Sequence, residues 1–210
     1  MPDHKEKNII AGKLSHPSVL PSVPVSYIGP VSRFTRCEPS TEKRFDLLVI
    51  ISGPEPQRSL FEKMILKQAM LSDKKIALVR GLPLSSEAHS SSRITVFNHL
   101  DVAQLNNLIC ESEFIVSRSG YTTIMDMMKL KKKMIVVPTP GQPEQEYLAD
   151  YLSKNNYVLK FKQQNFDLQR ALQKAENFTF NHVDANMDEY KVVLKDFVDR
   201  ISSLSLSSTH

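Results

Sequence analysis

The chain has few glycines and cysteines, and it has no long apolar run. Six glycines among 210 residues make about 3% of the chain, against roughly 7% in an average protein, so each is expected where only glycine fits. No apolar run approaches the roughly 20 residues of a membrane-spanning helix, and the first ten residues lack the apolar block of a secretory signal. The two cysteines, Cys37 and Cys110, lie far apart without metal-type spacing, which favours a reducing compartment. We therefore expect a cytoplasmic protein.

The charge of the chain is nearly balanced, with 27 lysines and arginines against 23 acidic residues and a formal net charge of +4. This mild excess suits an anionic ligand or a membrane surface and does not require nucleic acid, so we expect no nucleic-acid partner. A composition of 41% hydrophobic and 24% charged residues excludes wholesale disorder. The length is sufficient for one domain with a sizeable core.

From Phe45 onward, apolar runs of strand length alternate with apolar residues at helical spacing. Strands are expected at 46–53, 76–79, 94–97, 114–116, 134–137 and 157–159, and helices at 57–71, 101–111, 121–130, 144–155, 167–176 and 186–203. Strands that alternate with crossover helices form a parallel sheet that is covered on both faces. The sequence therefore predicts one Rossmann-like, doubly wound α/β domain over residues 45–203.

The two ends of the chain differ from this central part. Residues 1–44 contain six prolines, and only 23–28 has the composition of an extended segment, closed by the turn Gly29-Pro30. We interpret residues 1–44 as a linker with one strand. The serine-rich residues 204–210 are expected to form a disordered tail.

Ligands of doubly wound domains bind outside the carboxyl ends of the strands, so the residues after each strand are candidates. Ser52-Gly53 would let a phosphate approach the backbone, although no P-loop or dinucleotide motif is present. Phe97-Asn98 end another strand, where a base could stack or form hydrogen bonds. Both segments also have a purely structural interpretation, as a strand-to-helix turn and as a core Phe before a helix capped by Asp101.

The most informative strand end is VSRSGYTTIMD, over residues 116–126. Hydroxyl groups, a glycine and the N–H groups of a helix N-terminus converge there, as in a phosphate or pyrophosphate cradle. Asp126 lies about a turn and a half into the helix, from where a carboxylate could accept hydrogen bonds from a ribose diol. Alternatively, Ser119 caps the helix and Asp126 faces solvent or pairs with Lys129 or Lys133.

The strand at 134–137 leads into PTPGQPEQE, over residues 138–146. Gln145 and Glu146 in the first helical turn could bind sugar hydroxyls, because amide and carboxylate groups supply directional donors and acceptors. Acidic groups in a first turn would equally complement the helix dipole. The lysine-rich segment 129–133 ends the preceding helix, where cations complement the dipole; it could also face anionic lipid or a donor phosphate.

RSGYTTIMD, followed about ten residues later by VVPTPGQPEQEYLA, resembles the donor-binding half of family 28-type glycosyltransferases. These enzymes have the GT-B architecture of two Rossmann-like domains, and they include the peptidoglycan enzyme that transfers N-acetylglucosamine from UDP-GlcNAc to a lipid-linked acceptor. The resemblance covers about residues 47–160. It implies that this chain is the C-terminal half of a hexosyltransferase and binds a UDP-sugar, with UDP-N-acetylglucosamine as the expected donor.

The resemblance also implies a role for each matching position. The diphosphate would be held by Ser119, Gly120, Tyr121 and Thr122, with Arg118, Ser52 and Gly53 beside them. Asp126 would bind the ribose, and Phe97 and Asn98 would bind uracil. The donor sugar would be bound by Gln145, Glu146 and Gly141. Asp126 stands where the family usually has Glu, and Glu146 where it commonly has Gln. The second difference leaves the identity of the sugar open.

The family's first domain, with the acceptor site and the catalytic base, has no counterpart in residues 1–44. We assign no catalytic residue, and the scattered His16, His89, His99 and His182 are expected to be structural or on the surface. The implied partner is an N-terminal acceptor-binding domain or a partner subunit, with peripheral contact at the inner face of the membrane. The chain alone is then expected to be inactive.

No metal ligand is assigned and no cofactor is expected, because the chain has no Asp-x-Asp motif and a helix N-terminus can stabilise the leaving diphosphate. Two other functions stay open. One is a nucleotide-sugar hydrolase or epimerase-like domain, and the other is a non-catalytic nucleotide-sugar-binding subunit of a split transferase.

Overall fold

The computed structural model describes residues 1–210 apart from 39–41, 86–89, 185 and 208–210. Its elements are η1 (Gly12–Leu14), β1 (Phe45–Ile50), α1 (Gln57–Ala69), β2 (Ile76–Val79), β3 (Ile94–Phe97), α2 (Val102–Cys110), β4 (Ser112–Ser117), α3 (Tyr121–Lys129), β5 (Lys133–Val136), α4 (Pro143–Lys154), β6 (Leu159–Lys160), η2 (Gln163–Asn165), α5 (Leu168–Glu176) and α6 (Glu189–Ser207). The strands form one parallel sheet in the order β3-β2-β1-β4-β5-β6. This is the strand order of nucleotide-binding Rossmann folds, so the predicted α/β fold is confirmed.

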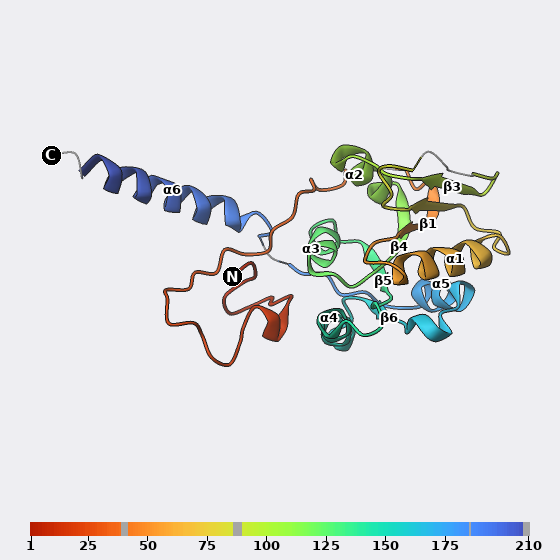
Figure 1. Cartoon of the computed structure of the whole chain (residues 1–210), viewed down its shortest axis with the longest axis horizontal. Helices are drawn as coiled ribbons and strands as arrows, with labels where there is room; N and C mark the ends of the chain where they lie inside the picture. Colours follow the sequence, from red (N-terminus) through yellow and green to blue (C-terminus); the bar gives the residue numbers. More distant parts are fainter. Residues whose placement is uncertain (39–41, 86–89, 185, 208–210) are drawn as a thin grey trace. The chain divides into compact units, whose positions relative to one another are not determined.

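The sheet is covered by helices on both faces. Figure 1 shows α1 and α5 on one face and α2 and α3 on the other. Leu47, Leu48 and Val49 of β1 are all fully buried, although consecutive side chains of a strand point to opposite faces. This explains why the strands have continuous apolar runs instead of an alternating pattern.

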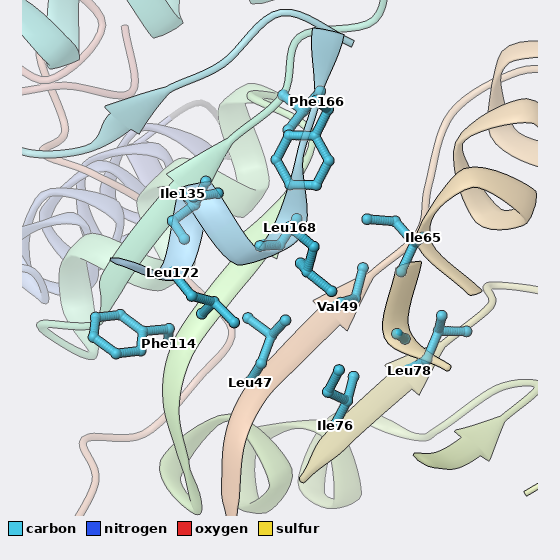
Figure 2. Packing of buried hydrophobic residues seen from close by; sticks show 14 of the residues in the cluster. Leu47, Val49, Ile65, Ile76, Leu78, Phe114, Ile135, Phe166, Leu168 and Leu172 are labelled. Atoms are coloured by element: carbon cyan, nitrogen blue, oxygen red, sulfur yellow. The ribbon is translucent and has the colours of Figure 1, made fainter. Parts of the chain in front are cut away.

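The main hydrophobic core lies between the sheet and the helices α1 and α5. Figure 2 shows side chains from β1, β2, β4 and β5 packing with Ile65 of α1 and with Leu168 and Leu172 of α5. Burial of each such aliphatic side chain contributes about 1.5–3 kcal/mol. The core therefore fixes the strand ends, from which the candidate site residues project.

The start of α2 confirms the predicted cap. The Asp101 carboxylate accepts a hydrogen bond from the backbone N–H of Gln104 at 2.8 Å, and the Gln104 side chain accepts one from the backbone N–H of Asp101 at 3.2 Å. This capping box fixes the residue at which the loop after β3 ends and α2 begins.

The chain divides into two compact units, Arg33–Val183 with the sheet, and Met1–Ser32 together with Asp184–His210. This grouping differs from the sequence-based boundaries, because it puts α6 with the N-terminal segment and residues 33–44 with the sheet. The described part of 1–44 contains no strand, so the strand expected at 23–28 is wrong. At the other end, α6 runs through Ser207, so residues 204–207 are helical and only 208–210 of the predicted tail lie outside the described residues.

The N-terminal segment folds around the fully buried carboxylate of Asp3. This carboxylate accepts hydrogen bonds from the backbone N–H of Ile10 at 3.0 Å, from that of Ala11 at 2.8 Å and from the hydroxyl of Ser15 at 2.6 Å. Side-chain bonds of this kind can hold a segment without helix or sheet hydrogen bonds, and here they hold residues 10–15 around Asp3. The segment is thus ordered without regular secondary structure.

Cys37 and Cys110 form a disulfide, with their Cα atoms 5.4 Å apart. Their sequence separation of 73 favoured a reducing compartment, but the fold brings the two cysteines into contact. The compartment itself stays a prediction. Within the described ranges, no helix has both the length and the apolar character to cross a membrane.

Candidate functional site

The strand order has its switch point at β1 and β4, and we call the space outside the carboxyl ends of these two strands the crevice. Successive strands add outward from β1 toward β3 on one side and from β4 toward β6 on the other, so the order reverses between these two neighbours. Ligands of open α/β sheets bind at such switch points, outside the carboxyl ends of the strands. Ile50 at the end of β1 pairs with Ser117 at the end of β4. The loops with Gly53 and Gly120, predicted separately as phosphate sites, therefore start side by side.

Gly120 is the N-cap of α3, and no side chain caps this helix. A Cβ added at Gly120 would have no heavy atom within 4 Å, so the space in front of the helix N-terminus is open. Thr122 in the first turn is exposed and Tyr121 is half-buried. A helix N-terminus has N–H groups without intrahelical partners and a partial positive charge, which together suit an anion.

On the β1 side of the crevice, Ser52 and Gly53 are exposed. Gly53 has φ +106°, a conformation that residues with a side chain rarely adopt. A Cβ at Gly53 would lie 3.7 Å from the hydroxyl oxygen of Thr139. That hydroxyl is buried and has no hydrogen-bond partner among the described residues. A hydroxyl group without a partner among the described residues thus lies beside Gly53.

The side chain of Ser119 points away from the crevice. It is fully buried, and its hydroxyl donates to the backbone carbonyl of Gln145 at 2.7 Å. The bond joins the loop after β4 to α4. A contact of Ser119 with a diphosphate would therefore use its backbone, and the proposed side-chain cap of α3 by Ser119 is not formed.

Arg118 is buried under the floor of the crevice, with 1% of its surface exposed. Its guanidinium donates to the backbone carbonyls of Val137 and Gln57, both at 3.0 Å, and lies 4.2 Å from the ring centre of Phe61. Burial lowers the pKa of Arg118 to about 10. Its Nε is buried without a hydrogen-bond partner among the described residues. Arg118 thus ties β5 and α1 to the end of β4 and adds positive charge below the site.

Asp126, the predicted ribose ligand, is buried on α3 and pairs with a residue that the sequence did not reveal. Its side chain is 8% exposed, and its Oδ2 lies 3.5 Å from Nε of Arg33, whose side chain is 58% exposed. The Arg33 guanidinium also lies 4.9 Å from the ring centre of Phe34. Of the predicted alternatives, Lys133 pairs with Glu113 instead.

Phe97 and Asn98 lie at the end of β3, and both are half-buried. The amide oxygen of Asn98 accepts from Nη1 of Arg80 at 3.0 Å, and its amide nitrogen donates to the carbonyl of Ser85 at 2.8 Å. The Asn98 side chain is therefore held by the protein, and a base would meet mainly the Phe97 ring and backbone groups.

The loop between β5 and α4 is closed by its own side chains. The amide oxygen of Gln145 accepts from the backbone N–H of Thr139 at 2.9 Å, and the carboxylate of Glu146 accepts from that of Gly141 at 3.3 Å. Gly141 has φ +78°, with no heavy atom within 4 Å of an added Cβ. The structure therefore places Gln145, Glu146 and Gly141 together next to the crevice.

A cavity of about 380 Å³ adjoins this loop, and Glu146 is one of its walls. Pro138 and Pro140 form another part of the wall, and Lys162 and Gln163 come from the segment after β6. Lys162 and Gln163 could not be linked to Glu146 from the sequence, because β6 is only two residues long. They line the same cavity as Glu146, which is a predicted sugar ligand.

The lysine-rich segment 129–133 lies at the opposite end of the sheet, because Lys133 begins β5. Lys129 and Lys132 are buried, and Nζ of Lys133 lies 2.5 Å from the carboxylate of Glu113. The segment therefore does not face the crevice, and only its contact with anionic lipid stays a prediction. Within the part of the chain that the structure describes, no group of three or more His, Cys, Asp or Glu residues could hold a metal ion; His89 lies outside that part.

The model of the glycosyltransferase family 28 C-terminal domain matches residues 47–201. In sequence, the chain is 21% identical over 154 residues to the UDP-N-acetylglucosamine--N-acetylmuramyl-(pentapeptide) pyrophosphoryl-undecaprenol N-acetylglucosamine transferase of Sulfurihydrogenibium sp. (strain YO3AOP1). The match covers 71% of this chain and 44% of that enzyme. The chain thus spans less than half the length of this curated relative.

Two solved structures have a similar fold. The glycotransferase of kitacinnamycin has a TM-score of 0.55 at 14% identity, covering 83% of this chain and 48% of that one. Glycosyltransferase VinC in complex with DTDP has a TM-score of 0.54 at 11% identity, covering 90% of this chain and 50% of that one. Both likenesses concern the fold, and both extend over about half of the larger chain.

Proposed function

Since this chain belongs to the glycosyltransferase family 28 C-terminal domain family, we propose that its sheet unit binds the nucleotide-sugar donor of a glycosyl transfer. The proposed donor is a UDP-sugar, and UDP-N-acetylglucosamine is the first candidate, since the curated relative is named for it. The observation that carries the proposal is the uncapped N-terminus of α3 facing open space at the switch point of the sheet.

The chemistry of the crevice supports a diphosphate at this position. The helix N-terminus supplies a fixed positive dipole at Gly120, and Arg118 adds a buried positive charge beneath it. Such preorganised groups stabilise a leaving diphosphate without reorganisation during the reaction. We propose that they do so here without a metal ion. The Thr139 hydroxyl beside Gly53 is a further donor for a phosphate oxygen.

The rest of the donor would extend along the carboxyl ends of the strands. We place the ribose near Asp126 and Arg33, the base against Phe97 at the end of β3, and the sugar near Gln145, Glu146 and Gly141. The acceptor and the catalytic base would come from a further domain or a partner subunit, because the chain spans 44% of the curated relative. We also propose that the protein contacts a membrane peripherally.

Calorimetric titration of the full chain with UDP-N-acetylglucosamine, UDP, dTDP and UMP tests the proposal. We expect UDP to bind at least tenfold more tightly than UMP, because the second phosphate lies at the α3 N-terminus, and EDTA to leave the UDP affinity unchanged. If none of these nucleotides binds, the proposed donor site is rejected. Release of free N-acetylglucosamine without an acceptor would instead favour a hydrolase.

A further inference from the structure

A chain of four charged side chains and one amide joins the carboxyl ends of β1, β2 and β3. We call it the Glu62 network, and it consists of Glu55, Arg58, Glu62, Arg80 and Asn98. Arg58 donates to the carboxylates of Glu55 and Glu62, in each case at 2.6 Å. Arg80 donates through Nε to Glu62 at 2.5 Å and through Nη1 to Asn98 at 3.0 Å. The network thus runs from the loop after Gly53 to the end of β3.

Glu62 is the centre of this network. It is 5% exposed, and each of its two carboxylate oxygens accepts from a different arginine. Arg58 is also buried, at 8% exposed, and donates to the backbone carbonyl of Arg80 at 3.2 Å. Buried charges are tolerated only where partners and geometry are well matched. Charge-assisted bonds of arginine are directional, so the network holds its members in one arrangement.

The far end of the network fixes the predicted base site. Arg80 fixes the amide oxygen of Asn98, and this bond determines which way the amide group points. The backbone is held as well, because the N–H of Arg80 donates to the carbonyl of Phe97 at 2.9 Å and the N–H of Leu82 to that of Asn98 at 2.7 Å. The groups that a base would meet at this strand end therefore depend on the position of Arg80.

We propose that Glu62 is a positioning residue for base recognition, which acts through Arg80 on the strand end at Phe97 and Asn98. The inference rests on the proposed function, because it concerns the same nucleotide. Uracil and cytosine differ at position 4, where a carbonyl accepts and an amino group donates a hydrogen bond. Discrimination between them requires partners held within about 0.5 Å of the required position, which Glu62 provides by holding Arg80.

Replacing Glu62 by Gln keeps the volume and removes the charge. The two arginines donate to different oxygens of Glu62. In the neutral amide one of these oxygens becomes an NH₂ group, which only donates, so one arginine would face a donor instead of an acceptor. We expect Glu62→Gln to lower the ratio of UDP affinity to CDP affinity at least fivefold in calorimetry. Glu176→Gln is the matched control, since Glu176 pairs with Lys74 away from the carboxyl ends of the strands. Its affinity ratio should equal that of the wild type.

Arg80→Lys is a second variant that retains the positive charge. A lysine can reach Glu62 or Asn98 but lacks the planar fork that joins them, so the same fall in the affinity ratio is expected. Amide hydrogen exchange of the ligand-free chain provides a separate measurement. In Glu62→Gln, exchange should become faster at residues 97–100 and stay unchanged in β5.

The outcomes distinguish this inference from the proposed function. If the wild type binds neither UDP nor CDP, the proposed function fails, and base recognition fails with it. If the wild type prefers UDP and both variants weaken UDP and CDP by the same factor, Glu62 supports the fold alone and the inference is overturned. Unchanged affinities in both variants would overturn it as well.

Discussion

Gly120 occupies a backbone conformation that any residue can adopt, with φ −68° and ψ 143°. Because an added Cβ has no heavy atom within 4 Å, Gly120→Val should fold with a change in unfolding free energy of about 1 kcal/mol or less. Its two methyl groups would stand in front of the α3 N-terminus, where the diphosphate is proposed to bind. We expect UDP affinity to fall at least tenfold in calorimetry, while the urea unfolding midpoint changes little.

A valine at Gly53 would not be an equivalent test. Gly53 has φ +106°, so a side chain there strains the backbone whether or not a ligand binds. Gly120→Ala is the better control, because one methyl group blocks less of the open space. UDP affinity that is unaffected by Gly120→Val would show that the diphosphate does not bind at this helix.

Asp126 and Arg33 give a second test at the residue scale. If the Asp126 carboxylate accepts hydrogen bonds from the ribose, the wild type should prefer UDP to 2′-deoxy-UDP by about tenfold, since a hydrogen bond to a charged group contributes roughly 1.5–3 kcal/mol. Asp126→Ala should remove this preference. Competition binding with both nucleotides measures it.

Arg33→Met is the matched variant for this pair. It removes the guanidinium that lies 3.5 Å from Asp126 and leaves the carboxylate in place, so the preference for UDP should persist. A preference for UDP that survives in Asp126→Ala would contradict the assignment of Asp126 to the ribose.

At the scale of secondary-structure elements, the turn from α3 to β5 contains a buried lysine, Lys132, whose pKa is lowered. Lys132 directly precedes β5 and donates through Nζ to the backbone carbonyl of Ser112 at the start of β4. Burial, and then the nearby charge of Lys43, lower the pKa of Lys132 to about 7. An unfolded lysine titrates near 10.4, so between about pH 7 and pH 10 the unfolded chain binds one more proton than the folded chain.

Stability should therefore rise with pH over this window because of Lys132, by at most about 1.4 kcal/mol per pH unit. Lys132→Met removes the titrating group. We expect this variant to be more stable than the wild type at pH 7, and the difference to shrink toward pH 10. Urea unfolding of both proteins at several pH values between 7 and 10 measures this difference in stability. Curves of stability against pH that run parallel would contradict the pKa shift of Lys132.

Elements whose signal is local could be predicted from the sequence. The apolar run of β1 and the helical spacing of α1 each lie within a few consecutive residues, and so does the capping residue Asp101. The same local signal failed at 23–28, where Ser26 and Ile28 form backbone hydrogen bonds with Met1 but no strand is present. Local composition describes what a segment can form, and the surrounding contacts decide between the possibilities.

The site was predictable to a similar extent. The motif around Gly120 identified the uncapped helix, because a glycine after a buried strand is a local signal. Asp126 pairs with Arg33, which is far away in the sequence, and Asn98 pairs with Arg80, which lies 18 residues earlier on the neighbouring strand end. Such pairs depend on how strands and helices pack, and no spacing in the sequence indicates them.

At the scale of the whole molecule, the disulfide between Cys37 and Cys110 ties the segment before β1 to the end of α2. It closes a loop of 73 residues in the sequence, and such a link contributes typically 2–4 kcal/mol by restricting the unfolded chain. We expect reduction to lower the unfolding free energy by about that amount and to leave UDP affinity unchanged, because neither cysteine borders the crevice.

Urea unfolding with and without dithiothreitol measures this effect, and Cys37→Ser is the control that should not respond to the reductant. Disulfides are rare in the cytoplasm, so the bond and the predicted compartment favour different redox conditions. A free thiol at Cys110 in protein isolated under non-reducing, alkylating conditions would contradict the bond.

The unit Arg33–Val183 contains every residue that we assign to the nucleotide and the sugar. The core cluster of Figure 2 runs from Leu47 to Phe180 and contains no residue of the other unit. We therefore expect a fragment of residues 33–183 to fold and to bind UDP within about threefold of the full chain, with circular dichroism and calorimetry as the measurements. Gly120→Val in the fragment should lower that affinity at least tenfold, as in the full chain. A fragment that folds but has lost UDP affinity would contradict the assignment, because it would show that residues 1–32 or 184–210 take part in the site.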